Sequence, residues 1–372
     1  ADDGAEGMNF GNALAIQGDT IIVGAPLAGV TPSAGGDSIK AGAVYVFERS
    51  SASWTQTAKL KASNADPYDL FGTSVAMDGD TIAVGAPGED SASRTINSGA
   101  DDNSLESDGA AYAFSRTGGQ WVEAAYLKRT GDGSGGTLNA GIGASVAVSG
   151  THVVVGCPST DASGFTDAGA AYVFNEDSGV WSLEQTLWVR SELTAAEAGS
   201  NFGTAVAVSG DSLAVGAPND QGTGLANGTV SIFSYSGTGV GWLPATRLGD
   251  FGHSGEFGAS LALQAGRLIV GDPLDLNSEQ GIDAAQSPQI SVAVGAVYLF
   301  DRIPLTSQWP LTHYIKASNA APYDLFGTSV ALGGDVFVVG APQRHSAPDD
   351  LYSPSDKYKF GPGASYVFQI VP

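Results

Sequence analysis

A motif that recurs six times with one internal spacing constrains this chain more than any other feature. Each copy begins with Phe-Gly or Ile-Gly, and a Gly-x-Pro follows with its glycine 14 positions after the first residue. The copies start at Phe10, Phe71, Ile142, Phe202, Phe257 and Phe326. Chance does not preserve one spacing through six copies, so the chain is an array of repeats.

Each repeat carries the pattern of four short strands. Two runs of small apolar residues, Ala13–Ile16 and Thr20–Val23 in the first repeat, flank a Gly-Asp turn and predict a β-hairpin. A third strand follows in Gly42–Phe47, and a fourth begins at a Trp in the first five repeats. An aliphatic residue lies six positions after each Trp, an even offset that is expected to place both on one strand face.

Four antiparallel strands per repeat are typical of propeller blades. The sequence therefore predicts an all-β fold, a single β-propeller domain over residues 1–372 with six blades. The last blade is expected to be incomplete, because only four residues follow Phe368 where a fourth strand should stand. A seven-bladed propeller is the alternative. The segment Lys61–Ala76 is repeated almost unchanged as Lys316–Ala331, which indicates recent duplication.

The composition limits the classes of partner. Lys and Arg number 16 against 39 Asp and Glu, a net charge of -23, which disfavours nucleic acid and favours cations or cationic partners. No apolar run is long enough for a membrane span. The single cysteine, Cys157, stands where other repeats have Ala or Asp and is interpreted as a small buried residue. The chain starts without Met, so a removed signal peptide or a neighbouring region is expected.

The loops differ in how much they vary. The connection between strands two and three is counted from the Gly-x-Pro proline to the glycine that begins the third-strand pattern. It takes between 10 and 22 residues. Connections at the opposite end are nearly constant, and aspartates in their Gly-Asp turns are explained by turn chemistry. The 2–3 and 4–1 loops also carry most of the acidic excess. A binding face is therefore predicted on these loops, although acidic loops can also serve only solubility.

One loop has the rhythm of a calcium site. Asp275, Asn277, Glu279 and Asp283 place oxygen ligands at alternating positions, and Gly281 allows a sharp bend. Such oxygen-rich, flexible coordination suits Ca²⁺, which is the predicted cofactor here. A solvated acidic loop is the alternative.

A second group of loop residues is predicted to bind the ligand. The acidic members lie in the 2–3 loop of the second repeat, and the aromatic members lie in the last 2–3 loop, where their rings could stack on a sugar or anchor a peptide. The residues are Asp101, Asp102, Glu106, Asp108, Tyr352 and Tyr358.

Signals of catalysis are few. The four histidines, His152, His253, His313 and His345, fall at unrelated repeat positions, and neither a Gly-x-Ser-x-Gly elbow nor a P-loop occurs. Carboxylates are numerous enough for a glycosidase-like pair to form in space. No catalytic residue is assigned, and a propeller hydrolase or lyase acting on polysaccharide stays an alternative.

The Phe-Gly, Gly-Ala-Pro and Gly-x-x-Tyr-x-Phe patterns resemble the FG-GAP repeat family, which includes the heads of integrin α subunits. Bacterial secreted and surface proteins with tandem copies are more similar still. The resemblance covers residues 9–368 and implies an extracellular or cell-surface propeller that recognises a ligand through its 2–3 and 4–1 loops. The calcium loop that integrin repeats often carry between strands one and two has no counterpart here, because that connection is a short turn in every repeat.

The sequence thus favours a non-enzymatic recognition or adhesion module that binds a protein or glycan partner, in a Ca²⁺-dependent way if the 275–283 loop holds the ion. The protein is expected to be a monomer or a module of a larger chain. A purely structural repeat module of a larger surface protein is the other alternative.

Overall fold

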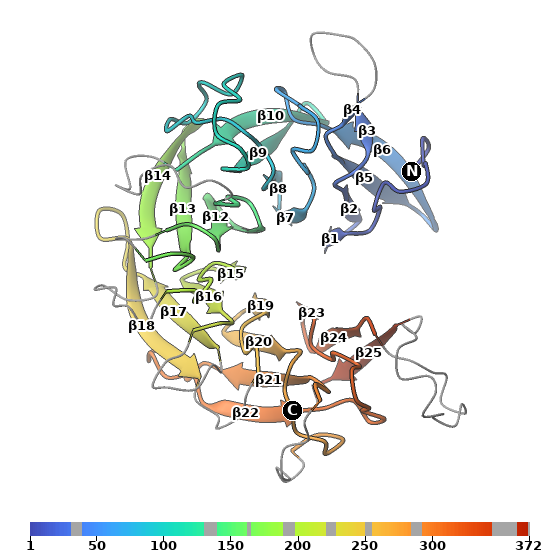
Figure 1. The fold of residues 1–372 in the computed structure, drawn as a ribbon, viewed down its shortest axis with the longest axis vertical. Helices are drawn as coiled ribbons and strands as arrows, with labels where there is room; N and C mark the ends of the chain where they lie inside the picture. The colour runs from blue at the N-terminus through green and yellow to red at the C-terminus, as the bar shows by residue number, and fades with distance from the viewer. Residues whose placement is uncertain are drawn as a thin grey trace. The chain divides into compact units, whose positions relative to one another are not determined.

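The computed structural model describes residues 1–30, 39–129, 140–161, 165–188, 198–220, 228–249, 255–283, 292–343 and 363–370. The regular elements in these ranges are all β-strands. They form six antiparallel sheets, one for each repeat, and one two-stranded ribbon (Figure 1). The chain divides into two compact units, Ala1–Val206 and Ala207–Pro372, which are described separately.

The first unit contains three four-stranded sheets. Their strands follow chain order across each sheet, as in an up-and-down blade. The first sheet consists of β1 (Ala13–Gln17), β2 (Thr20–Ala25), β5 (Ala43–Ser50) and β6 (Ser53–Leu60), with the ribbon of β3 (Gly29–Val30) and β4 (Ile39–Lys40) in its 2–3 loop. The next two consist of β7 (Ser74–Asp78), β8 (Thr81–Ala86), β9 (Ala110–Thr117) and β10 (Gln120–Leu127), and of β11 (Ser145–Ser149), β12 (His152–Cys157), β13 (Ala170–Asp177) and β14 (Val180–Leu187).

The fourth, fifth and sixth sheets belong to the second unit. The first strand of the fourth sheet begins at the boundary between the units. That sheet consists of β15 (Ala205–Ser209), β16 (Ser212–Ala217), β17 (Thr229–Tyr235) and β18 (Trp242–Gly249). The fifth consists of β19 (Ser260–Gln264), β20 (Arg267–Asp272), β21 (Ala296–Asp301) and β22 (Leu311–Ile315). Among the described residues the sixth consists of β23 (Ser329–Gly333), β24 (Val336–Ala341) and β25 (Ala364–Gln369).

These sheets confirm the predicted all-β propeller fold of six blades, and in the described residues the last sheet has three strands. The predicted hairpins are confirmed too, since Gln17 pairs with Thr20 around a two-residue turn in the first sheet and Asp78 pairs with Thr81 in the second. No helix in the described ranges has the length and apolar character needed to cross a membrane. The single-domain boundary stays a prediction.

The prediction that each Trp shares a strand face with the aliphatic residue six positions later is wrong in the first four sheets. A β-bulge interrupts the pairing of the third and fourth strands. In the first sheet Trp54 is opposite Arg49 and Leu60 is opposite Val44. Arg49 and Val44 are an odd number of residues apart on the third strand, so Trp54 and Leu60 lie on opposite faces. The extra residue of a bulge reverses the alternation of side chains, a change that the offset alone cannot reveal.

Within each unit, the backbones of successive sheets approach each other closely at the repeated glycines. Gly42 forms a parallel bridge with Phe71, and the amide of Phe71 donates to the carbonyl oxygen of Ala41 at 2.9 Å. The Gly-x-Pro glycine faces the next repeat: a Cβ built on Gly85 would lie closer than 3.0 Å to the carbonyl oxygen of Gly143. A side chain at such a glycine therefore cannot be accommodated without separating the sheets.

The apolar core lies between neighbouring sheets. In the second and third sheets, the second and third strands are buried on both faces along most of their length. Tyr45, Tyr112, Tyr172 and Tyr298 are at most 1% exposed, and Phe71 packs edge-on against Tyr112 with ring centroids 5.3 Å apart. Cys157 is fully buried in this core, as predicted.

The junction predicts a large difference between two identical substitutions. Gly85 and Gly340 occupy the same repeat position, and an added Cβ would approach the hydroxyl of the preceding serine in both, but only at Gly85 would it also meet the next repeat's carbonyl. We expect Gly85→Ala to lower the free energy of unfolding by about 1–3 kcal/mol or more, as overpacking does. Gly340→Ala, measured by urea unfolding in the same buffer, should cost clearly less. Equal losses would contradict the junction.

Candidate functional site

A buried carboxylate recurs in three repeats. It lies two residues after the Gly-x-Pro proline, at the start of the 2–3 loop. In each case a cationic side chain from the end of the fourth strand pairs with it. The pairs are Glu89 with Lys128, Asp220 with Arg247, and Asp275 with Lys316. The three carboxylate residues are at most 2% exposed. Because an isolated buried charge is very unfavourable, each pair constrains where the loop can leave the sheet.

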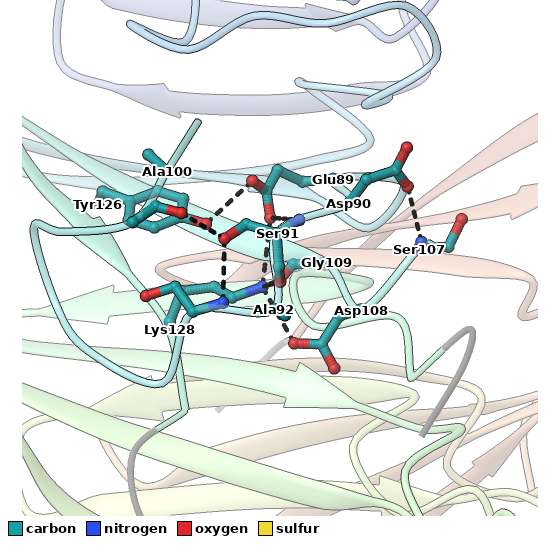
Figure 2. A network of polar contacts seen from close by, with 12 residues as sticks. Glu89, Asp90, Ser91, Ala92, Ala100, Ser107, Asp108, Gly109, Tyr126 and Lys128 are labelled. Atoms are coloured by element: carbon teal, nitrogen blue, oxygen red, sulfur yellow. Dashed lines mark hydrogen bonds and ion pairs between the residues drawn. The ribbon is translucent and has the colours of Figure 1, made fainter. Parts of the chain in front are cut away.

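Figure 2 shows the network around the pair of the second repeat. Lys128 Nζ lies 3.2 Å from Glu89 Oε2 and also donates to the carbonyl oxygens of Ser91 and Gly109, both at 2.7 Å. The Tyr126 hydroxyl donates to Glu89 Oε1 at 2.9 Å. One ammonium group thus ties together both ends of the 2–3 loop, because Ser91 follows β8 and Gly109 precedes β9.

Asp108 extends this network and differs from its predicted role. Its carboxylate is fully buried and lies 3.0 Å from Lys128 Nζ, 2.6 Å from Arg129 Nη2 and 2.9 Å from Arg94 Nη1. Arg129 in turn donates to the Thr160 hydroxyl at 2.8 Å. A carboxylate that is held by three cations and closed to solvent anchors the loop. Ligand binding by Asp108 stays a prediction, for which this burial offers no support.

The other acidic residues predicted on this loop are at its surface. Asp101, Asp102 and Glu106 are all exposed. Their backbone is held by Asp90, whose carboxylate accepts the amide of Ser107 at 2.8 Å and whose carbonyl accepts the amide of Leu105 at 2.8 Å. The loop is thus folded on itself, with three carboxylates presented outward.

Hydrogen bonds join this 2–3 loop to the 4–1 loop that precedes the second repeat. Asn64 donates to the carbonyl oxygen of Ala100 at 2.9 Å, and Asn103 donates to Asp66 Oδ2 at 2.8 Å. The amide of Gly88 donates to the carbonyl oxygen of Asp69 at 3.0 Å. The structure therefore brings together the two kinds of loop that the sequence predicts as a binding face.

The 4–1 loop contains an exposed aromatic beside a buried acid. Tyr68 is 64% exposed with a φ of 70°, and Leu70 has a φ of 60°, while Asp69 between them is 1% exposed. Left-handed backbone at such residues is uncommon and is maintained here by the surrounding contacts. The duplicated segment repeats the arrangement at Tyr323, Asp324 and Leu325, with φ values of 68° and 54° at the Tyr and Leu.

Burial raises the pKa of the Asp69 carboxyl to about 8, and the neighbouring charges of Glu89, Asp66 and Asp90 act in the same direction. Burial also raises the pKa of Glu89. Desolvation and like charges both disfavour the ionised form of a carboxyl group. The Asp69 carboxyl, buried beneath the exposed loops, thus keeps its proton near neutral pH.

The fifth repeat has an equivalent network at the residues predicted to bind calcium. Asp275 is fully buried, and its Oδ1 accepts from Lys316 Nζ at 2.7 Å and from the Tyr314 hydroxyl at 3.0 Å. Its Oδ2 accepts from the Tyr298 hydroxyl at 3.1 Å. Both oxygens of Asp275 are therefore committed to groups of the protein.

Of the other three predicted ligands, Asn277 lies beside Asp275, and its backbone amide donates to Asp275 Oδ1 at 2.8 Å. Asn277 is buried, and its side-chain Oδ1 accepts the backbone amide of Glu279 at 3.1 Å. Asp283 lies at the surface with its Oδ2 2.7 Å from His313 Nδ1. Within the described ranges no three His, Cys, Asp or Glu side chains form a group that could hold a metal ion. Calcium binding by this loop stays a prediction, for which this arrangement offers no support.

Asp272 is a residue whose importance the sequence analysis missed. It replaces the small residue of Gly-x-Pro, is 3% exposed, and accepts the amide of Glu256 at 2.8 Å. Burial raises its pKa well above the ordinary value, and the charge of Asp275 adds to the effect. The signal was present, because no other repeat has a charged residue at this position. Tyr352 and Tyr358 lie outside the described residues.

Comparison with known proteins agrees with the repeat architecture. A family model described as FG-GAP repeat matches residues 1–47, 54–114, 190–233 and 309–368, which is more than half of the chain. The chain belongs to the FG-GAP repeat family.

The other comparisons give no further information about the function of this FG-GAP protein. No curated protein matches it. Among solved structures, the Pseudomonas aeruginosa periplasmic gluconolactonase PpgL is similar with a TM-score of 0.49 and 13% identity, over 96% of this chain and 84% of that chain. At these values the likeness carries no argument about activity.

The ion pair of the second repeat predicts a strong effect of removing its cation. Lys128→Met removes a positive charge that Glu89 and Asp108 share, while both carboxylates stay buried. Breaking a buried ion pair in this way lowers the free energy of unfolding by about 3–5 kcal/mol. Lys59→Met is the control, because the pair of Lys59 with Asp3 is partly exposed and should contribute about 1 kcal/mol or less. Urea unfolding of both variants measures the difference. A loss at Lys128 no larger than at Lys59 would contradict the anchoring role.

The raised pKa of Asp69 predicts a pH dependence. The folded protein keeps a proton at Asp69 that the unfolded chain releases, so this contribution to stability is full below about pH 4 and is lost as the pH rises to about 8. Asp69→Asn keeps an oxygen that can accept the amide of Asp66 but cannot ionise. We expect the urea midpoint of the wild type to fall more between about pH 5 and pH 9 than that of Asp69→Asn. Glu106→Gln, an exposed change nearby, should behave as the wild type does.

Proposed function

We propose that this FG-GAP protein is a non-enzymatic recognition module, and that its partner binds the face made by the 2–3 loop at 88–108 and the 4–1 loop at 61–70. The observation that carries the proposal is the construction of this face. Buried ion pairs fix both ends of the longer loop, and hydrogen bonds through Asn64 and Asn103 join the two loops. A loop ordered before binding loses less conformational entropy on association, which favours affinity.

The exposed chemistry of this face favours a cationic protein or glycan. Asp101, Asp102 and Glu106 are exposed carboxylates, and Asp66 and Asp90 lie beside them in the same pair of loops. Tyr68 adds an exposed ring that can stack on a sugar or cover a cationic side chain. The net charge of -23 acts in the same direction over a longer range and favours fast association with positive partners.

The position of the acids with raised pKa favours binding over catalysis. Asp69 and Asp272 keep their protons as a general acid would, but they are 1% and 3% exposed. A general acid must come within hydrogen-bond reach of the group it protonates. A polysaccharide chain cannot approach side chains that are buried to this degree. We therefore propose that these acids stabilise the loops and take no part in catalysis.

The proposed location is outside the cytoplasm, at the cell surface or in a secreted or periplasmic form. Family membership supports it, since FG-GAP repeats resemble those of adhesion proteins and of secreted bacterial proteins. The chain has one cysteine and forms no internal disulfide, so its stability outside the cell rests on sheet junctions and buried ion pairs.

Two triple variants test the proposed face. Asp101→Asn/Asp102→Asn/Glu106→Gln removes three charges from it, and Asp19→Asn/Asp80→Asn/Asp177→Asn removes three exposed charges from turns at the other end of the first three sheets. Both variants and the wild type are applied to arrays carrying Lys-rich peptides, glucosamine oligosaccharides, neutral glycans and extracellular proteins. Each array is read at low and high salt, with Ca²⁺ or with a chelator.

We expect the loop variant to lose at least about tenfold in affinity, equivalent to about 1.4 kcal/mol, and the turn variant to lose about twofold or less. Salt should weaken the wild type more than the loop variant. Equal losses in the two variants would contradict the proposed face. Polysaccharide turnover that Asp69→Asn abolishes would replace the binding function by a hydrolase or lyase.

A further inference from the structure

The buried ion pair of the fifth repeat differs from that of the second in how its lysine is held. Lys128 Nζ has four acceptor atoms within 3.2 Å, two from carboxylates and two from backbone carbonyls. Lys316 Nζ is equally closed to solvent, and its hydrogen-bond acceptor among the described residues is Asp275 Oδ1, at 2.7 Å. The centroid of the Tyr314 ring lies 5.8 Å away. An ammonium group has three N–H donors, so two donors of Lys316 have no acceptor among these residues.

This surrounding disfavours the charged forms of the pair. Both side chains are closed to solvent, and burial makes an ionised carboxyl group and an ammonium group costly. Because Lys316 Nζ is hydrogen-bonded to Asp275 Oδ1, transfer of one proton along this bond gives a neutral amine beside a neutral carboxyl group. Asp272, whose pKa is raised by burial, keeps its proton and adds no charge that would favour the ammonium form.

The neutral amine is then placed to react with the carboxyl carbon of Asp275, to which Oδ1 is directly bonded. The Tyr298 hydroxyl donates to Oδ2 at 3.1 Å, where negative charge develops when an amine adds to this carbon, and such donors stabilise that charge. The Tyr314 hydroxyl and the Asn277 amide donate to Oδ1 at 3.0 Å and 2.8 Å and fix the carboxyl group in place. Two reacting groups held in this way behave as if present at about 10⁵ M or more.

We propose that Lys316 and Asp275 condense to an amide, which links the end of the fourth strand covalently to the start of the 2–3 loop. A bond forms between Nζ and Cγ, and the bond between Cγ and Oδ1 breaks. Oδ1 leaves as water with two protons of the ammonium group, and the third proton stays on the amide nitrogen. The reaction needs no oxidant, reductant or other reactant. Its product is neutral, so the cost of keeping two charges buried disappears.

The second repeat shows why the same reaction is not expected at Lys128. Four acceptor atoms satisfy its ammonium group, and Asp108 is also held by Arg129 and Arg94. Neighbouring cations favour the ionised carboxylate, which an amine does not attack readily. The inference concerns a modification within the fifth repeat and does not depend on the proposed ligand.

Mass spectrometry of the full chain under denaturing conditions tests the proposal. We expect the wild type to be lighter than its sequence mass of 37.6 kDa by one water, about 18 Da. An amide at Lys316 also removes a trypsin cleavage site. The tryptic peptide 268–302, which contains Asp275, should therefore be recovered joined to the uncleaved peptide 303–344.

Two variants complete the test. Lys316→Arg retains a cation that cannot form this amide, and should have its full sequence mass. Lys59→Arg is the control and should lose water as the wild type does, because Lys59 also pairs with an aspartate, Asp3, but in a partly exposed site. The linked peptide is sought in the wild type, so the result does not require the Lys316 variant to fold. A wild type of full mass with separate peptides would overturn the proposal, and so would a loss of water that persists in Lys316→Arg.

Discussion

The contact of one repeat's glycine with the Phe-Gly backbone of the next is the interaction on which the sheets of each unit depend. It explains the constant spacing of the motif. The amide of Gly72 donates to the carbonyl oxygen of Gly85 within one hairpin, and the same bond joins Gly143 with Gly156 and Gly258 with Gly271. The two glycines must therefore lie opposite each other across a hairpin of constant length, with both free to approach the neighbouring repeat. Insertions can be tolerated only in the 2–3 and 4–1 loops, beyond this contact.

The second constraint is electrostatic and acts on those loops. A long acidic loop on an acidic protein is repelled by its surroundings, and the buried lysine or arginine at the end of the fourth strand offsets this locally. In the second repeat Lys128 and Arg129 face Glu89 and Asp108, so buried positive and negative charges are equal in number. The loop can then present exposed carboxylates from a fixed base. The proposed binding face thus depends on residues that no partner touches.

The strands were predictable because their signals are local. Apolar runs, Gly-Asp turns and the aromatic third strand identify hairpins residue by residue, and six copies of the pattern indicate blades. The β-bulge in the fourth strand was not predictable from the offset between Trp54 and Leu60, since the extra residue leaves the composition of the strand unchanged. Family membership followed from the same motifs and is confirmed.

The site was predictable only in part, because the sequence shows acidic residues but not which of them are buried. Asp101 and Asp108 belong to one acidic run, yet the first is exposed and the second is closed to solvent. Asp275 has the rhythm of a calcium ligand, but Lys316, which lies 41 positions later in the chain, occupies its carboxylate. Aligning the repeats would have shown the pattern, since an acid two residues after the proline accompanies a cation at the end of the fourth strand.

Hydrogen exchange at the amides that start the repeats tests the junction most directly. The amides of Phe71, Ile142, Phe202 and Phe326 donate to a carbonyl of the preceding repeat, and Phe10 has no such partner among the described residues. In dilute protein, nuclear magnetic resonance or mass spectrometry should show slow exchange at these four amides, comparable to the second strands, and fast exchange at Phe10. Exchange at Phe71, Ile142 and Phe202 as fast as at Phe10 would contradict the account.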